Sequence, residues 1–492
     1  MDKKFLFNFP WIVLAAALGL TLIGLAGIYS TTLSHGPSAD SGGVLRETPQ
    51  SLAEVQLTWL LVSLGVCAVV VYPSYTRLAQ YSYLFYLGSL VLLVILFVAR
   101  FLPGGQGIAH LVEPRNHAFC WFQIPGTKIA FEPSEVAKIA FIMALAQYLR
   151  YRRNYRTWTG LVPPFLMALA PTLLILSQPA LGMALMYMPV LVLMLLAAGA
   201  RVRHLALVAL VIVLLTPALY LKVERYQQRR VDQWLLAGPL EDFHFQQHDL
   251  QRQGAKRTPE QERAAVAALR GSWRVRAYLA ADYAKWWTGC HAGWLFGNNK
   301  LTRKGFCDGP YRSELDPDPA LPDTPFKRAQ TFVRNWLTGT GYQPWQAKVA
   351  VGSGGLTGEG FGAGTQTQYG FLPESHTDYI YAVIAEEWGF VGAAVVLLLY
   401  LIIIIFGVDV GLATNEPYGK LLAVGLVAMI TTQAFLNMAI TVGLTPVTGI
   451  TLPLVSYGGS SLVASYVAIG LLCNIGMRRY VLSAPTPFTF RD

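Results

Sequence analysis

The sequence predicts an all-α polytopic membrane protein with about ten transmembrane helices and a large exoplasmic loop between the seventh and eighth. Of the 492 residues, 54% are hydrophobic and only 13% are charged, a composition that argues against a soluble globular protein. The apolar residues gather into blocks of about 17–25 residues, the length that crosses a bilayer core. Lysine and arginine are concentrated in alternate short connections, as expected of cytoplasmic loops.

The predicted transmembrane helices follow these apolar blocks. They lie near residues 11–33, 56–73, 79–101, 134–149, 160–177, 182–200, 204–221, 379–407, 419–443 and 454–476. Residues 1–221 therefore hold the first seven helices, 378–478 the last three, and 479–492 a short tail. The first block has no small-residue cleavage site before its polar loop, so we interpret it as a retained helix; a cleaved signal peptide is the alternative.

The orientation follows from the basic residues of the short connections. The residues that fall on one side are Lys3, Lys4, Arg77, Arg150, Arg152, Arg153, Arg156, Arg201, Arg203, Lys420, Arg478 and Arg479. That side is predicted to be the cytoplasm. With ten membrane crossings, both termini are expected to be cytoplasmic.

Residues 222–377 form the predicted exoplasmic loop, with an inserted subdomain at about 235–339 and a glycine-rich segment after it. Residues 222–348 carry 20 Lys or Arg against 13 Asp or Glu. Outside the cell, this excess suits an anionic partner such as lipid headgroups, pyrophosphate or an acidic peptide rather than nucleic acid; a merely solvated surface is the alternative. Within the insert, Thr258, Pro259, Gln261 and Gly271 have the pattern of a capped helix, and "DPDPALPDTP" is predicted to be a linker.

The five cysteines favour no metal site. There is no Cys-x-x-Cys pair, so a structural zinc site is not predicted. Cys67 and Cys473 lie in apolar blocks and are expected to fill space. Cys290 and Cys307 fall in the exoplasmic loop, where they are able to form a disulfide.

A dense run of glycines precedes the eighth predicted helix. Seven glycines lie between residues 352 and 364, in "GSGGLTGEGFGAG". Exposed backbone N–H groups in such a segment are able to bind phosphate, although no Gly-Lys-Ser/Thr of a Walker motif follows.

Few charged residues occur inside the predicted helices. Glu135 and Lys138 stand three apart, on one helix face and at pairing distance, which suits either a structural ion pair or a substrate contact. Glu386 and Glu387 are adjacent and diverge by about 100° on a helix, so they are expected to have different partners.

Asp378 is the candidate catalytic residue. It stands at the outer end of the eighth predicted helix, with Glu374 four residues before it and His376 two before it. A carboxylate at such a boundary is partly desolvated, which favours a general base. The alternative is that Asp378 caps the helix N-terminus.

The segment between the last two predicted helices is rich in proline, glycine and hydroxyl groups. Its sequence, "GLTPVTGITLPLVSYGGSS", suggests a chain that bends back into the membrane and offers Thr448, Ser456 and Ser460 to a polar ligand. Transporters use broken helices in this way, so these residues alone also allow a transporter.

These segments together resemble the SEDS family (shape, elongation, division and sporulation), which includes RodA, FtsW and SpoVE. The motifs that carry the resemblance are "PSEVAK", the glycine-rich segment followed by "GTQTQ" and "FLPESHTD", and the C-terminal signature from Asn437 through "GLTPVTGITLPLVSYGGSS". "QAKVAVGSGG" and "GTQTQYGFLPE" are more similar to RodA than to FtsW. The resemblance implies a peptidoglycan glycosyltransferase that polymerises lipid II, with inversion, at the outer face of the bacterial cytoplasmic membrane.

The resemblance also implies roles for individual residues. Asp378 matches the aspartate required in the family's His-Thr-Asp motif and would accept the proton of the attacking hydroxyl. A divalent cation (Mg or Mn) is a possible cofactor beside the pyrophosphate. The residues assigned to substrate binding are Lys348, Glu374, His376, Gln366, Glu135, Lys138, Ser456 and Ser460.

Three features depart from the family pattern. Ala180 stands where an aspartate is expected, Cys120-Trp121 replaces an Arg-Trp pair, and about 105 residues are inserted after "YQQRRVDQW". The insert is a candidate docking region for a class B penicillin-binding protein, the expected transpeptidase partner beside other elongasome or divisome membrane proteins. The alternatives to an enzyme are a lipid II flippase or transporter and a non-catalytic scaffold for that partner.

Overall fold

The chain forms helices over most of the residues that its structure, a computed structural model, describes. These are residues 9–33, 50–99, 112, 120–123, 130–152, 156–178, 180–222, 225–252, 258–272, 274–278, 325–339 and 341–478. Cys290, Cys307 and residues 316–324 of the predicted linker lie outside them.

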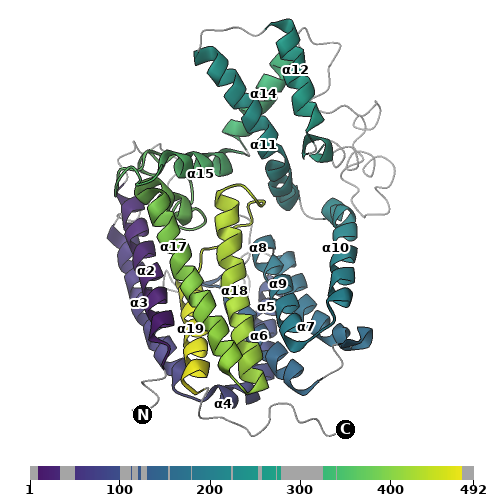
Figure 1. The fold of residues 1–492 in the computed structure, drawn as a ribbon, viewed down its shortest axis with the longest axis vertical. Coiled ribbons are helices and arrows are strands. Elements are labelled where there is room, and N and C mark those ends of the chain that lie inside the picture. Colours follow the sequence, from purple (N-terminus) through teal and green to yellow (C-terminus); the bar gives the residue numbers. More distant parts are fainter. Residues whose placement is uncertain are drawn as a thin grey trace. The chain divides into compact units, whose positions relative to one another are not determined.

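The N-terminal half consists of helices that follow one another along the chain (Figure 1). They are α2 (Trp11–Thr32), α3 (Gln50–Val71), α4 (Tyr75–Gln80), α5 (Ser82–Ala99), α6 (Pro133–Tyr151), α7 (Trp158–Ser177), α8 (Leu181–Leu185), α9 (Tyr187–Ala198) and α10 (Val202–Lys222). A small antiparallel hairpin, which the sequence did not predict, precedes α6 and pairs β1 (Phe122–Gln123) with β2 (Ala130–Phe131).

The C-terminal half continues with α11 (Arg225–Arg252), α12 (Pro259–Gly271), α14 (Pro325–Thr338), α15 (Tyr342–Ser353), α16 (Thr365–Gln368), α17 (Ile380–Ala413), α18 (Pro417–Thr441) and α19 (Gly459–Arg478). The long helix α17 is broken at Gly389, whose φ of 64° and ψ of −161° are not helical. A glycine is suited to this position because L side chains rarely adopt such a φ.

Eight helical segments among the described residues are long and apolar enough to cross a membrane. They lie in α2, α3, α5, α7, the pair α8 and α9, α17, α18 and α19. Helix α6 occupies another predicted position but carries Glu135, Lys138 and Arg150, and α10 contributes the shorter apolar stretch Val202–Ile212. The helical, polytopic class is confirmed, and the number ten stays a prediction.

The chain divides into two compact units. The first comprises residues 1–207, 347–442 and 448–492, and the second comprises 208–346 with 443–447. The glycine-rich segment therefore belongs to the unit that holds the transmembrane helices, whereas most of the predicted insert forms the other.

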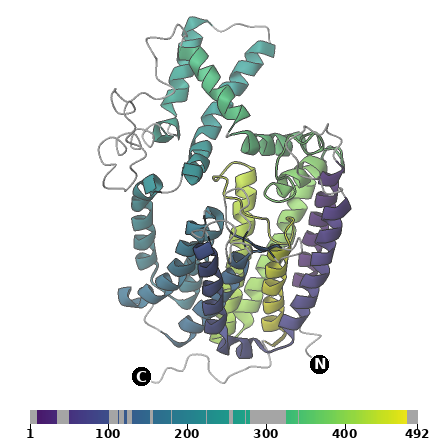
Figure 2. The same ribbon diagram turned by 180° about the vertical axis from the view of Figure 1, so that it is seen from behind.

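In the first unit, small residues let the helices approach closely. Helix α17 packs against α2 and α18, and α18 also packs against α6 and α9. In the view from behind (Figure 2), α19 lies near the N-terminal helices, in agreement with its packing against α3. A Cβ on Gly425 of α18 would overlap Ile142 of α6, and one on Gly407 of α17 would overlap Val427 of α18. Small residues serve the same purpose at many membrane helix interfaces.

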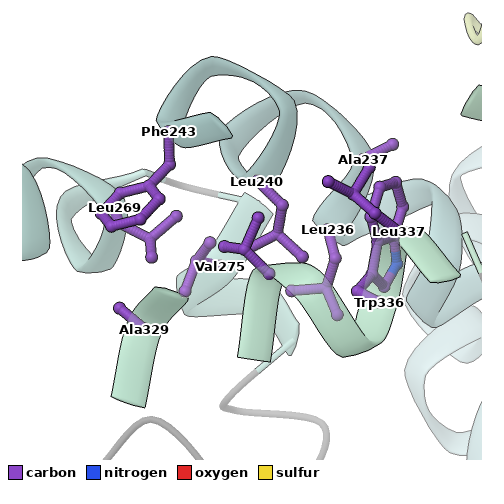
Figure 3. Packing of buried hydrophobic residues seen from close by; sticks show 10 residues of the cluster. Leu236, Ala237, Leu240, Phe243, Leu269, Val275, Ala329, Trp336 and Leu337 are labelled. Carbon is purple, nitrogen blue, oxygen red and sulfur yellow. The ribbon is translucent and has the colours of Figure 1, made fainter. Parts of the chain in front are cut away.

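The second unit has its own hydrophobic core. Figure 3 shows Leu236, Leu240 and Phe243 of α11 packed with Leu269 of α12 and with residues of α14 that include Trp336. The predicted cap of α12 is confirmed: Thr258 Oγ1 accepts from the Gln261 N–H, and Gln261 Oε1 accepts from the Thr258 N–H. The described residues of the insert are thus helical and share one core.

Candidate active site

Asp378 lies in a tight turn that leads directly into α17. The turn is closed at Glu374, whose carbonyl oxygen accepts the N–H groups of Thr377, Asp378 and Tyr379 at 3.2, 3.2 and 3.3 Å. Glu374 has a φ of 52°, a left-handed conformation that costs a non-glycine residue about 1–2 kcal/mol. Tyr379, not Asp378, occupies the N-cap position of α17, so the helix-cap interpretation of Asp378 is wrong. The Asp378 residue is partly exposed.

Three consecutive carbonyl groups fix this turn to the C-terminal part of the chain. The carbonyl oxygen of His376 accepts from the Tyr457 N–H at 2.9 Å, and that of Thr377 accepts from Ser456 Oγ at 2.6 Å. The carbonyl oxygen of Asp378 accepts from Asn437 Nδ2 at 2.9 Å. A backbone held at three successive residues presents its side chain in a restricted orientation, as a catalytic group requires.

The segment between α18 and α19 supplies two of these donors and is itself pinned. Asn437 Nδ2 also donates to the carbonyl oxygen of Ile450 at 2.7 Å. Ser456 Oγ accepts from the Leu452 N–H at 2.8 Å. Gln56 of α3 donates to the Ser456 carbonyl and accepts from the Gly458 N–H, both at 3.2 Å. Ser456, assigned to substrate binding, is buried and uses its hydroxyl to hold the turn.

A second polar network joins α6 to the same C-terminal segment. Lys138 Nζ lies 3.1 Å from Glu135 Oε2, as their spacing predicted, and donates to Gln433 Oε1 at 3.0 Å. Gln433 Nε2 in turn donates to the Thr451 carbonyl at 3.1 Å, and the hydroxyls of Thr451 and Ser461 lie 3.0 Å apart. Glu135 and Lys138 are both buried, so each compensates the charge of the other.

The outer end of α6 carries a further carboxyl group in an unusual environment. Burial, together with the nearby Glu135 carboxylate, raises the pKa of Glu132 to about 7. Ser134 Oγ donates to Glu132 Oε1 at 2.6 Å. Glu132 therefore holds a proton over much of the range below neutral pH.

The imidazole of His376 is neutral at physiological pH. Burial lowers its pKa, against the opposing influence of Glu374. Its ring lies edge-on to Tyr457, with centroids 5.7 Å apart. The structure thus gathers Glu374, His376, Asp378 and Ser456 around one turn.

The other residues assigned to substrate binding lie on separate elements of the first unit. Lys348 is on α15 and partly exposed, Gln366 is on α16, and Ser460 is partly exposed in the first turn of α19. Asn437 and Gln56 were not predicted to act at the site. The signal in the sequence was an amide side chain within a predicted transmembrane helix.

Several amides of the glycine-rich segment are already used in hydrogen bonds within the protein. The N–H groups of Glu359 and Gly360 donate to the carbonyl oxygens of Glu386 and Glu387 at 2.9 and 3.0 Å. A Cβ on Gly354 would overlap the carbonyl oxygen of Ala385, and one on Gly358 would overlap that of Glu387. These contacts account for the glycines, so the phosphate-cradle interpretation is not supported at these positions.

Two of the departures from the expected pattern meet in space. Cys120 Sγ donates to the carbonyl oxygen of Gln178 at 3.3 Å, and Ala180 follows two residues later, at the start of α8. Gln178 is anchored in turn, because its Nε2 donates to the Leu93 carbonyl at 3.1 Å. Cys120 thus contacts the residue two before Ala180, and both side chains are neutral.

No group of three or more His, Cys, Asp or Glu side chains within the described part of the chain is arranged to hold a metal ion. The predicted divalent cation has no preformed protein site there. Magnesium is often held by one or two carboxylates plus substrate phosphates.

The comparisons with known proteins agree on one family. The family model described as "Cell cycle protein", for FtsW, RodA and SpoVE, matches residues 11–244 and 323–481. The residues between these two matches lie inside the predicted insert.

Curated relatives match over most or part of the chain. A probable peptidoglycan glycosyltransferase FtsW of Geobacter sulfurreducens is 28% identical over 480 residues, which cover 97% of this chain and 98% of the relative. The peptidoglycan glycosyltransferase RodA of Treponema pallidum is 28% identical over 480 residues, covering 96% and 98%. The peptidoglycan glycosyltransferase MrdB of Escherichia coli K12 is 43% identical over 145 residues, covering 30% and 39%.

Solved structures share the fold. One, described as "Structural coordination of polymerization and crosslinking by a peptidoglycan synthase complex", has a TM-score of 0.60 at 22% identity and covers 96% of this chain and 98% of its own. The rod shape determining protein RodA of Thermus thermophilus, as a D255A mutant, has a TM-score of 0.54 at 22% identity with the same coverage.

Proposed function

The chain belongs to the FtsW, RodA and SpoVE family of cell cycle proteins, and on this premise we propose that it is a peptidoglycan glycosyltransferase that polymerises lipid II, with Asp378 as its general base. The relatives that match nearly the whole chain are named for this activity. The observation that carries the role of Asp378 is its turn, fixed by hydrogen bonds at three successive carbonyls and leaving the residue partly exposed.

The proposed reaction needs one proton acceptor. The 4-hydroxyl of one sugar attacks the anomeric carbon of the next unit, and its proton passes to the Asp378 carboxylate. The new glycosidic C–O bond forms as the C–O bond to undecaprenyl pyrophosphate breaks, with inversion at the anomeric carbon. A positioned general base of this kind contributes about 10²–10⁴-fold to a rate.

The neighbouring residues suit this chemistry. A neutral His376 leaves Asp378 without an adjacent imidazolium that would weaken it as a base. Lys348, partly exposed on α15, would offset the charge that develops on the departing pyrophosphate. The buried Glu135–Lys138 pair contacts Gln433, which holds Thr451 in the segment that carries Ser456. In this proposal the pair supports the site through that series of hydrogen bonds.

We extend the proposal to location and partner. The distribution of basic residues supports cytoplasmic termini and a position for Asp378 on the outer side of the bacterial inner membrane. A class B penicillin-binding protein is the proposed partner, because one similar fold was solved in a complex that couples polymerisation to crosslinking. The helical insert, which has its own core, is the proposed docking region.

The test uses purified full-length protein in liposomes with fluorescent lipid II, with and without its partner. Glycan ladders are expected from the wild type, and Asp378→Asn is expected to lower the rate by about 10²-fold or more. Asp409→Asn, at the opposite end of α17 and exposed, makes the same charge change and is expected to retain activity.

Each rival function gives a different result in this assay. A flippase or transporter would move labelled lipid II across the bilayer without forming ladders, and the Asp378 variant would not stand out. A scaffold would form no glycan even with its partner. Either result would refute the proposed polymerase.

A further inference from the structure

Two buried carboxylates on α17 have no part in the reaction proposed above. Glu386 and Glu387 are 0% and 2% exposed, and burial of a carboxylate needs compensating hydrogen bonds. Their partners differ, as their divergence on the helix predicted, although Glu387 also accepts from Gln368 of α16 and from the Gly362 backbone. Glu387 accepts from Ser30 Oγ of α2, whereas Glu386 Oε1 accepts from the Gln366 N–H at 2.6 Å and Glu386 Oε2 from Thr367 Oγ1 at 2.7 Å, both on α16.

The break in α17 fixes the backbone of the same two residues. In an unbroken helix the N–H groups of Phe390 and Val391 would donate to the carbonyls of Glu386 and Glu387. Here the N–H groups donate instead to Gly355 and Leu356, at 2.9 and 3.1 Å, and the vacated carbonyls accept from Glu359 and Gly360. The glycine-rich segment therefore supplies partners for the backbone groups that lose their helical hydrogen bonds at the break. These bonds restrict the backbone position of Glu386.

Helix α16 connects Glu386 to the turn that carries Asp378. The carbonyl oxygen of Gln366 accepts the N–H groups of Phe371 and Leu372 at 3.0 and 3.1 Å. Glu374, two residues further on, closes the turn. Glu386 lies on α17, the helix that Asp378 precedes. Its hydrogen bond to Gln366 therefore joins the two ends of the segment 366–386, which contains the turn, into one closed ring.

A neighbouring contact shows how tightly the ring is closed. A Cβ on Gly364, the residue before α16, would lie 2.8 Å from Cδ of Glu386, closer than real Cβ atoms approach. Gln368 Nε2, at the other end of α16, donates to the Ser30 carbonyl at 3.1 Å. Helix α16 is thus held from both sides, by α17 through Glu386 and by α2 through Gln368.

We propose that Glu386 is a positioning residue for this enzyme, which holds Gln366 and the Asp378 turn in register without touching the substrate. The inference rests on the proposed polymerase activity and goes beyond it by assigning a role to a buried carboxylate. Glu416, the N-cap residue of α18, is a carboxylate that likewise accepts a backbone N–H, that of Gly419 at 2.6 Å, but it lies outside this ring, so it is the matched control.

The experiment compares Glu386→Gln and Glu416→Gln with the wild type in the lipid II assay. Glu386→Gln is expected to lower kcat at least 10-fold while the KM for lipid II changes less than 2-fold. Glu416→Gln is expected to keep kcat within 2-fold for the folded fraction, even if its melting temperature falls. Hydrogen–deuterium exchange of residues 366–379 is expected to increase in Glu386→Gln and not in Glu416→Gln.

A double-mutant cycle distinguishes positioning from general loss of stability. If Glu386 acts through α16, Thr367→Val and Glu386→Gln are non-additive in kcat. Equal loss of kcat in both glutamine variants, or wild-type kcat in Glu386→Gln, would overturn the assignment and leave the role of Asp378 standing. A wild-type protein that forms no glycan would overturn the polymerase proposal and this inference together.

Discussion

The side-chain amide of Asn437 donates to the backbone carbonyl oxygen of Asp378 at 2.9 Å, and the same nitrogen donates to the Ile450 carbonyl at 2.7 Å. Asn437 lies on α18 and is 0% exposed. One buried nitrogen thus joins three segments: the catalytic turn, α18 and the polar segment before α19. Its loss should therefore disturb both the packing of these segments and the position of Asp378.

Replacement of Asn437 by alanine removes both hydrogen bonds, one to the buried Ile450 carbonyl and one to the partly buried Asp378 carbonyl. The expected cost is about 2–4 kcal/mol of unfolding free energy, with a loss of polymerisation rate per folded molecule of about 10-fold or more. The measurements are thermal unfolding in detergent and the lipid II assay. Asn474 is the control, because it is equally buried and its Nδ2 also holds two carbonyls, those of Val70 and Pro73, beside α4. Asn474→Ala should lose similar stability but no specific activity.

Glycines that touch α17 should not tolerate alanine. Gly354→Ala places a methyl group against the Ala385 carbonyl, and overpacking of this kind costs about 1–3 kcal/mol or more. Gly352, two residues earlier in α15, has open space where the methyl group of an alanine would lie, so Gly352→Ala should be neutral or stabilising by up to about 1 kcal/mol. Equal melting temperatures for the two variants would contradict the packing described for this segment.

The conformation of Glu374 is testable separately from its carboxylate. Because its φ is 52°, Glu374→Gly should be more stable than Glu374→Ala by about 1 kcal/mol, as glycine adopts this region without steric cost. Thermal unfolding of the two variants measures the difference. An alanine variant as stable as the glycine variant would show that the turn relaxes.

Two titrating groups should give opposite pH dependences. Burial raises the pKa of Glu132 from 4.5 to about 7. The folded state therefore binds more protons than the unfolded state between these values, and the stability it contributes is full below pH 4.5 and lost as the pH rises to about 7. Glu132→Gln, which keeps an acceptor for Ser134, should raise the melting temperature at pH 8 by about 2–4 °C and have little effect at pH 4.5.

For His376 the sign is reversed. Its folded pKa is lowered below its ordinary value of 6.5, so the unfolded state binds more protons in the window between. Stability from this group is complete above pH 6.5 and is lost as the pH falls through the folded pKa. The melting temperature of His376→Gln should therefore fall less than that of the wild type between pH 7 and pH 5. A parallel decline would contradict the assigned shift.

The sequence alone determined the features that depend on local pattern. Apolar blocks of bilayer length predicted the helices, the three-residue spacing predicted the Glu135–Lys138 pair, and the Thr258 pattern predicted a capped helix. Hydropathy and helical periodicity are properties of a short stretch of sequence, so each can be recognised within a single segment of the chain. The position of Asp378 just before α17 was predictable for the same reason.

Only the tertiary structure decided which distant groups meet. Asn437 and Asp378 are 59 residues apart in the chain, and Ser456 and Thr377 are 79 apart. The backbone groups left without helical partners at Gly389 form hydrogen bonds with residues 355–360. The sequence of α17 alone does not indicate these partners. A buried donor or acceptor in a membrane helix must find a partner, but its own segment does not specify which one, because that choice depends on how all the helices pack together.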